Sequence, residues 1–198
     1  MHGRLLNNRI RVMLVCALVA GAAAPGCIFE TREPIPPGSG SSSWLTPDFP
    51  DKIFANLKSG LEELDGENYN RSLNDIFTFV PLPDDVDQFP AGTYGNWTAE
   101  VEKTVVQGIV SDASAISVAF DNLTQTISQG QNAQFESDYT LTVTNAISGV
   151  ETFKGKARLD MLNGSKGWEL IRWEDIERVS GFATWGFLRG RIRQQQGG

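Results

Sequence analysis

The chain has 198 residues, of which 40% are apolar and 21% are charged, and its net charge is −7. This composition is typical of one globular domain with appendages, and about 150 residues can bury a core without disulfide or metal support. The only histidine is His2, and both cysteines, Cys16 and Cys27, lie near the N-terminus. If the N-terminal segment that contains His2 is removed by processing, the remaining chain has no imidazole for a Ser-His-Asp or Cys-His mechanism or a histidine zinc site. It also has no disulfide framework.

The first 26 residues have the pattern of a secretory leader. A basic segment without acidic residues precedes an apolar run from Val12 to Ala24, which is too short to span a membrane. The run ends in Ala24-Pro25-Gly26-Cys27, which resembles the lipobox of bacterial lipoproteins. The resemblance implies cleavage before Cys27 and acylation of that cysteine, which would hold the protein on a lipid bilayer.

Two alternatives to the lipobox remain open. An ordinary leader could be cut near Ala23 and leave Cys27 as a free thiol, or the apolar run could stay attached as an uncleaved anchor. The lipoprotein resemblance further implies a place in the cell envelope. Ile28, instead of aspartate, follows the cysteine, which favours the outer membrane where the host has one.

The processed chain is acidic and tethered. Removal of residues 1–26 leaves 14 basic and 24 acidic residues, a net charge of −10, which opposes binding to nucleic acid. The cluster that comes nearest to a basic patch consists of Arg189, Arg191 and Arg193, and it is interpreted as a solvated tail. Residues 27–43 comprise the lipidated cysteine and a tether rich in Pro, Gly and Ser, and residues 44–198 form the globular domain with its C-terminal tail.

The first half of the domain has helical periodicity. Thr46-Pro47 predicts the start of an amphipathic helix that runs to about Leu64. A second short helix is expected to carry Tyr69, Leu73, Ile76 and Phe77 on one face. An irregular acidic loop follows over residues 81–90, and Asn96 is expected to cap a third helix whose inward side chains are Trp97, Val101, Val105 and Ile109.

The second half alternates with a period of two, which is typical of half-buried strands. Alternating segments cover residues 116–121, 135–144, 153–161 and 168–173, and the broken alternation of the last segment indicates a bulge. Turn signals occur at 148–149 and 163–167. The sequence therefore predicts an α+β domain in which about three helices cover one face of about four antiparallel strands.

This order of elements resembles the NTF2-like superfamily, an α+β cone with a curved sheet. The resemblance covers residues 47–177 and includes Gly167-Trp168 and Trp173 near its end. It implies a fold that serves isomerases and dehydratases as well as binding proteins, so it does not define one function. The tail beyond it contains Trp185 and Leu188, which are expected to fold back on the sheet; the role of residues 179–193 is left open.

The resemblance also places candidate residues inside the cone. Enzymes with this fold commonly use an interior aspartate with a histidine or tyrosine, and here Asp75, Tyr69, Tyr94 and Tyr139 are the available groups. A carboxylate with a raised pKa and a tyrosine could act as an acid/base pair. The alternative, purely structural interpretation is that Asp75 is solvated and the tyrosines belong to the core. The residues expected to line a cavity are Tyr69, Trp97, Tyr139, Trp168 and Trp173.

Other chemistry has no support in the sequence. Asp84, Asp85 and Asp87 lack the spacing of a calcium loop, and there is no glycine-rich phosphate loop, so no cofactor or metal is predicted. The leading hypothesis is a non-catalytic NTF2-like domain of unassigned biochemical role. It would bind a small apolar ligand in its cavity or, through a sheet face rich in Thr, Lys and Arg, an envelope protein or a second copy of itself. One alternative is an isomerase or dehydratase that uses an interior Asp/Tyr pair. Another is an envelope scaffold, which would have a cone filled by its own side chains.

Overall fold

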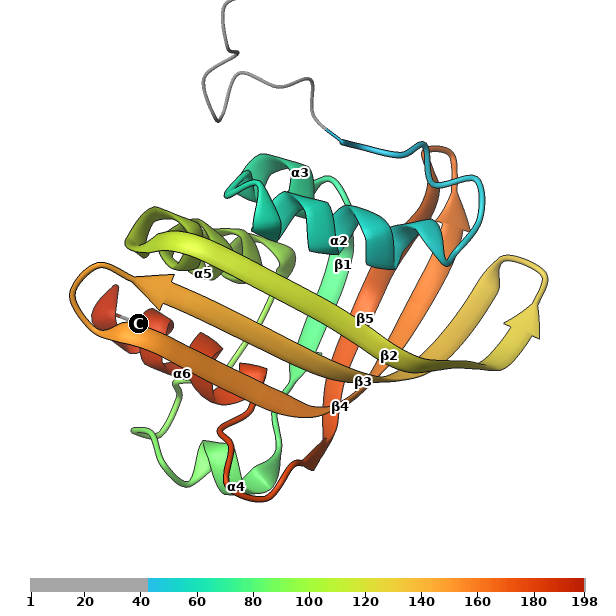
Figure 1. Cartoon of the computed structure of the whole chain (residues 1–198). Helices are drawn as coiled ribbons and strands as arrows, with labels where there is room; N and C mark the ends of the chain where they lie inside the picture. Colours follow the sequence, from blue (N-terminus) through green and yellow to red (C-terminus); the bar gives the residue numbers. More distant parts are fainter. Residues whose placement is uncertain (1–42, 198) are drawn as a thin grey trace, which may run out of the picture. The chain divides into compact units, whose positions relative to one another are not determined.

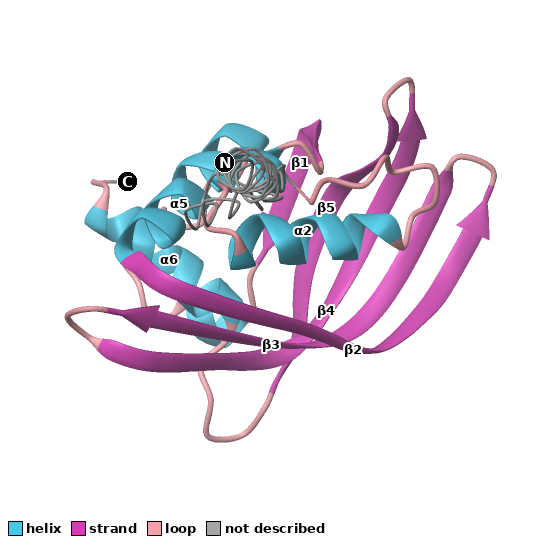
Figure 2. Ribbon diagram, turned by 45° about the horizontal axis from the view of Figure 1, so that its top comes forward, coloured by secondary structure: helices cyan, strands magenta, loops and turns pink. Residues whose placement is uncertain are grey.

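The computed structural model describes residues 43–197, and the predicted leader, Cys27 and nearly all of the tether lie outside the described residues. Within residues 43–197, five strands form one sheet in the order β1-β5-β4-β3-β2. The helices α2, α5 and α6 lie on the same side of this curved sheet (Figure 2). The predicted α+β architecture is confirmed, with one strand more than expected.

The helices cover the concave side of the sheet (Figure 1). Helix α2 (Lys52–Glu62) buries Ile53, Phe54, Leu57 and Leu61, which is the periodicity that predicted it. It begins at Lys52 with Asp51 as its N-cap, so the predicted start at Thr46-Pro47 is wrong, and Phe49 is exposed. The shorter helices are α3 (Gly66–Asn70) and α4 (Pro83–Val86).

The predicted second helix is wrong beyond Asn70. Residues Leu73–Val80 form strand β1, which pairs in parallel with β5. Phe77 and Phe79 are buried, whereas Ile76, the residue before Phe77, is 64% exposed. The Ile-Phe-Thr-Phe-Val segment consists of β-branched and aromatic side chains, which favour a strand, and this preference outweighs the helical spacing of Leu73, Ile76 and Phe77.

The other strands follow the predicted meander. β2 (Ala113–Gln129), β3 (Asn132–Asn145), β4 (Gly149–Gly164) and β5 (Gly167–Arg178) pair antiparallel in sequence order. Register shifts between β4 and β5 at Lys156/Ala157 and Asp160/Met161 confirm the expected irregularity of the last strand. The tail forms helix α6 (Trp185–Gln195), in which Trp185 and Leu188 are buried as expected.

Helix α5 (Ala99–Asp112) begins later than predicted. Its N-cap is Thr98, whose hydroxyl accepts a hydrogen bond from the Val101 N–H. Asn96 lies outside the helix with φ of 50°, a left-handed conformation that asparagine tolerates better than most residues. The Asn96 side chain is therefore not the cap.

Replacement of Thr98 by alanine is expected to lower the free energy of unfolding by about 1 kcal/mol, because a helix N–H loses its acceptor. Thr98→Ser keeps the hydroxyl and serves as the matched control. Urea unfolding of both variants measures the effect, and equal stability of Thr98→Ala and the parent chain would contradict the assigned cap.

Candidate functional site

The interior of the cone contains an ion pair. Arg189 of α6 and Glu102 of α5 are both 0% exposed. The Arg189 Nε atom donates to the Glu102 Oε1 and Oε2 atoms at 3.0 and 3.1 Å, and Nη2 donates to Oε1 at 2.8 Å. A buried charge of this kind is tolerated only when it is paired.

Aromatic side chains surround the guanidinium group. The Arg189 Cζ atom lies 4.5 Å from the ring centroid of Phe79, 4.6 Å from that of Trp173 and 4.7 Å from that of Trp185. At these distances the ring faces attract a cation, and the attraction is strongest where water is excluded. The rings of Trp173 and Trp185 also contact each other edge to face, with centroids 4.7 Å apart.

The Glu102 carboxylate also accepts hydrogen bonds from two of the predicted cavity residues. The Tyr69 hydroxyl donates to Oε1 at 2.9 Å, and the Trp97 Nε1 atom donates to Oε2 at 2.8 Å. Burial, together with the adjacent Glu102 charge, raises the pKa of Tyr69 well above its usual value. Burial acts to lower the pKa of Arg189, but the Glu102 carboxylate outweighs it and holds that pKa above the usual value.

A second buried carboxylate, Asp175 of β5, holds the first turn of α6. Its Oδ1 atom accepts from the Trp173 Nε1 atom at 2.8 Å, and Oδ2 accepts from the Gly186 N–H at 2.8 Å. Burial raises the pKa of Asp175 to about 6, although Arg189 and these hydrogen bonds oppose the shift. A Cβ atom at Gly186 would lie 2.6 Å from Asp175 Oδ2, so glycine permits this close approach.

The N-terminus of α6 is fixed by further polar contacts. The Thr184 hydroxyl accepts from the Phe187 N–H at 2.9 Å and donates to the buried carboxylate of Asp85, which also accepts from Arg178. The Tyr139 hydroxyl accepts from the Trp185 N–H at 3.0 Å. Helix α6 is therefore held inside the cone by hydrogen bonds at its first turn and by the ion pair further along.

The structure brings four of the predicted cavity residues to this interior. Tyr69 and Trp97 bind Glu102, while Tyr139 and Trp173 adjoin the start of α6. Trp168 is buried at the other end of β5, where its backbone N–H donates to the Pro47 carbonyl at 2.8 Å. It therefore lies apart from the rest of the set.

The remaining candidates of the acid/base hypothesis lie in different places. Asp75 is exposed on β1, not on a helix, so it is not the interior carboxylate. The Tyr94 hydroxyl donates to the Gly186 carbonyl at 3.0 Å, and burial raises the pKa of Tyr94. The interior carboxylates are instead Glu102, Asp175 and Asp85.

The interpretation of the C-terminal arginines as a solvated tail is wrong. Arg189 is fully buried, Arg191 makes a two-pronged ion pair with Glu151 at 2.7 and 2.8 Å, and the Arg193 guanidinium lies 5.1 Å from the ring centroid of Trp97. Trp185, Leu188, Arg189 and Ile192 recur at helical spacing and are all buried, so this face of α6 belongs to the core.

The arrangement leaves the interior carboxylates engaged. Glu102, Asp175 and Asp85 each accept hydrogen bonds from donors of the chain itself, and the Arg189 side chain occupies the centre of the cone. An acid/base catalyst must contact its substrate, and with α6 in this position these carboxylates contact other groups of the chain instead. Within residues 43–197, no three Asp, Glu, His or Cys side chains are grouped to hold a metal ion.

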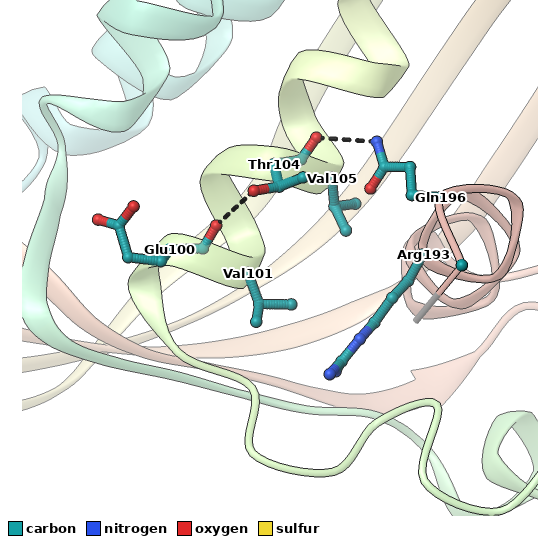
Figure 3. A pocket seen from close by; sticks show the side chains of 7 residues that line it. Glu100, Val101, Thr104, Val105, Arg193 and Gln196 are labelled. Atoms are coloured by element: carbon teal, nitrogen blue, oxygen red, sulfur yellow. Dashed lines mark hydrogen bonds between the residues drawn. The ribbon is translucent and has the colours of Figure 1, made fainter.

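A hollow of about 310 Å³ lies between α5 and α6 (Figure 3). At its edge, the Gln196 Nε2 atom donates to the Thr104 carbonyl at 3.1 Å. The hollow is separate from the interior cluster, since none of the interior carboxylates lines it. Its lining residues are Glu100, Val101, Thr104, Val105, Arg193, Gln196 and Gly197.

Comparison by sequence finds no matching family model and no matching curated protein. Comparison by structure finds similar folds. A candidate scytalone dehydratase from Novosphingobium aromaticivorans has a TM-score of 0.55 at 12% identity, covering 69% of this chain and 90% of that chain. An NTF2-like superfamily protein from Salmonella enterica has a TM-score of 0.51 at 11% identity, covering 66% and 89%.

A third similar structure is a candidate aromatic ring hydroxylase from Novosphingobium aromaticivorans. It has a TM-score of 0.51 at 12% identity, and the match covers 63% of this chain and 82% of that chain. At such identities the likeness is one of fold. The domain therefore has the NTF2-like α+β cone that the order of its elements predicted, with an interior that its own C-terminal helix fills.

Proposed function

We propose that this protein is a membrane-tethered lipoprotein of the cell envelope, and that its NTF2-like domain binds a partner without catalysing a reaction. The observation that carries the proposal is the position of Arg189. Its guanidinium group occupies the interior in which an enzyme of this fold would hold a substrate, and it pairs there with Glu102. A cone filled by its own side chains favours binding of a partner at the outer surface of the sheet.

The outer face of the sheet offers the binding surface. The helices cover the opposite face (Figure 2), and the outer face carries half-exposed ion pairs. Glu136 contacts Lys156 and Arg158 at 2.9 Å each, and Arg158 reaches Glu174 at 3.5 Å. Exposed pairs of this kind contribute about 0–1 kcal/mol, so a partner protein or a second copy of the chain can replace them at little cost.

The tether is supported by the sequence. Ala24-Pro25-Gly26-Cys27 supplies the acylation site, and a Pro-, Gly- and Ser-rich segment separates it from the domain. None of the helices in residues 43–197 is long and apolar enough to cross a bilayer. Attachment through acyl chains on Cys27 requires no such helix, since about two chains give stable anchoring.

The intact mass of the protein tests the anchor. When the full chain is produced in a bacterial host, we expect the membrane fraction to contain residues 27–198 with acyl groups added. Cys27→Ala should be neither cleaved at this site nor acylated. Cys16→Ala is the matched control, because Cys16 lies within the segment to be removed. An unacylated parent chain cut near Ala23 would contradict the lipid anchor.

Native mass spectrometry of the same sample tests the filled interior. We expect a domain without a non-covalent small molecule, as a monomer or as a dimer. A small molecule that is released on denaturation would contradict the proposal and would supply the mass of its ligand.

The second candidate function is an isomerase or dehydratase. The observation that favours it is Asp175, a buried carboxylate with a pKa of about 6 next to Tyr139, which would suit a general base at neutral pH. Such an enzyme would require α6 to leave the cone, because the Gly186 N–H and Trp185 N–H occupy these two groups. Recovery of a bound small molecule in the native spectrum would favour this candidate.

A further inference from the structure

The seat of the Arg189 guanidinium is built by parts of the chain other than α6. Glu102 comes from α5, Tyr69 from α3, Phe79 from β1 and Trp173 from β5. All of these side chains are at most 4% exposed. Helix α6 contributes the arginine itself and the ring of Trp185.

The chemistry of this seat matches a planar, delocalised cation. Flat rings face the guanidinium group, while the Glu102 carboxylate and the Tyr69 hydroxyl accept along one of its edges, with Tyr69 at 3.3 Å from Nη2. A guanidinium offers this combination of flat faces and a forked row of donors, whereas an ammonium group has neither.

One nitrogen of the guanidinium is not used. The Nη1 atom of Arg189 is buried and has no hydrogen-bond partner in the part of the chain that the structure describes. Recognition therefore runs through Nε and Nη2, the edge that any N-alkylguanidinium also presents.

We propose that the interior of the cone is a binding site for an alkylguanidinium group, with Arg189 as its internal ligand. This goes beyond the proposed function, which uses the outer surface only. The seat is formed by Glu102, Tyr69, Phe79 and Trp173, and it accepts a free alkylguanidinium when the arginine side chain is shortened. Helix α6 is the element that delivers the internal ligand and closes the site.

Arg189→Ala in the full chain tests the site. The substitution removes the atoms of an N-ethylguanidinium ion, which is therefore the matching probe. The variant should melt well below the parent chain, because Glu102 loses its partner. Millimolar N-ethylguanidinium should then raise its melting temperature in a saturable way by about 5 °C. The parent chain should show no saturable rise, because Arg189 already fills the seat.

Controls separate specific binding from a general solvent effect. N-ethylurea has nearly the same shape without charge and should not stabilise Arg189→Ala. The double variant Glu102→Gln/Arg189→Ala should not respond to N-ethylguanidinium. If Arg189→Ala is unfolded alone, the titration follows ligand-induced folding by near-ultraviolet circular dichroism of the tryptophans. Absence of a saturable response, or equal rescue by N-ethylurea, overturns the site and leaves the lipid anchor unaffected.

Discussion

Glu102→Gln is expected to lower the free energy of unfolding by about 3–5 kcal/mol at pH 7. Glutamine keeps the shape of the side chain but only one of the two oxygens that accept from Tyr69 and Trp97, and it leaves the Arg189 charge in the interior without a counter-charge. Both side chains of the pair are 0% exposed, so water cannot replace the lost carboxylate. Urea unfolding with linear extrapolation measures the loss.

Two further variants isolate the pair. Glu100→Gln changes a neighbouring carboxylate of α5 that is 82% exposed and contacts Lys103, and it should alter stability by less than about 1 kcal/mol. The double variant Glu102→Gln/Arg189→Met removes both charges and should cost less than the sum of the single changes. A loss below about 1 kcal/mol for Glu102→Gln would show that the interior charge is not held as the structure describes.

The sequence predicts the sheet better than the helices because the two patterns differ in clarity. Alternation in residues 135–144 and 153–161 has one buried and one outward face, and this fixes the strand register. The segment that includes Ile76 and Phe77 fits both periods, and only its β-branched and aromatic content favours a strand. The predicted start of a helix depends on a single capping residue, and Thr46 and Asn96 are plausible caps that the chain does not use.

The periodicity contains the interior charges but does not identify them as a buried pair. Glu102 precedes Val105, Val106 and Ile109 on the buried face of α5, and Arg189 lies among Trp185, Leu188 and Ile192 on the buried face of α6. Each is a charged residue at a core position of its helix. A general preference for charges in solvent favours a solvated tail, and nothing local in the sequence indicates that the two charges meet.

Glu102 and Arg189, which form the pair, are 87 residues apart in the sequence. Only the closed cone brings α5 and α6 together, so the partner of either charge follows from tertiary structure. The burial of Asp175 has a local signal in the sequence. Asp175 lies two residues after the buried Trp173 on the same strand, so both side chains point inward. The aromatic candidates were easier to place, since large rings belong to the core in almost any fold.

The domain is expected to become more stable as the pH falls from 7 towards 5. Burial raises the pKa of Asp175 from 3.8 to about 6, so between these values the folded chain binds a proton that the unfolded chain does not. The free energy of unfolding therefore falls as pH rises through 6, and the ionised group costs the folded state about 3 kcal/mol in full. About 1 kcal/mol of this should be recovered between pH 7 and pH 5.

Asp175→Asn separates this effect from that of other carboxylates. Hydrogen bonds lower the pKa of Glu136 through Lys156 and that of Glu151 through Arg191, so these groups contribute stability that is lost only at more acidic pH. Asp175→Asn should therefore have a flat stability profile between pH 7 and pH 5, whereas the matched control Asp48→Asn, at an exposed carboxylate, should keep the rise of the parent chain. A parent chain that loses stability over this interval would show that Asp175 is not a buried acid at the base of α6.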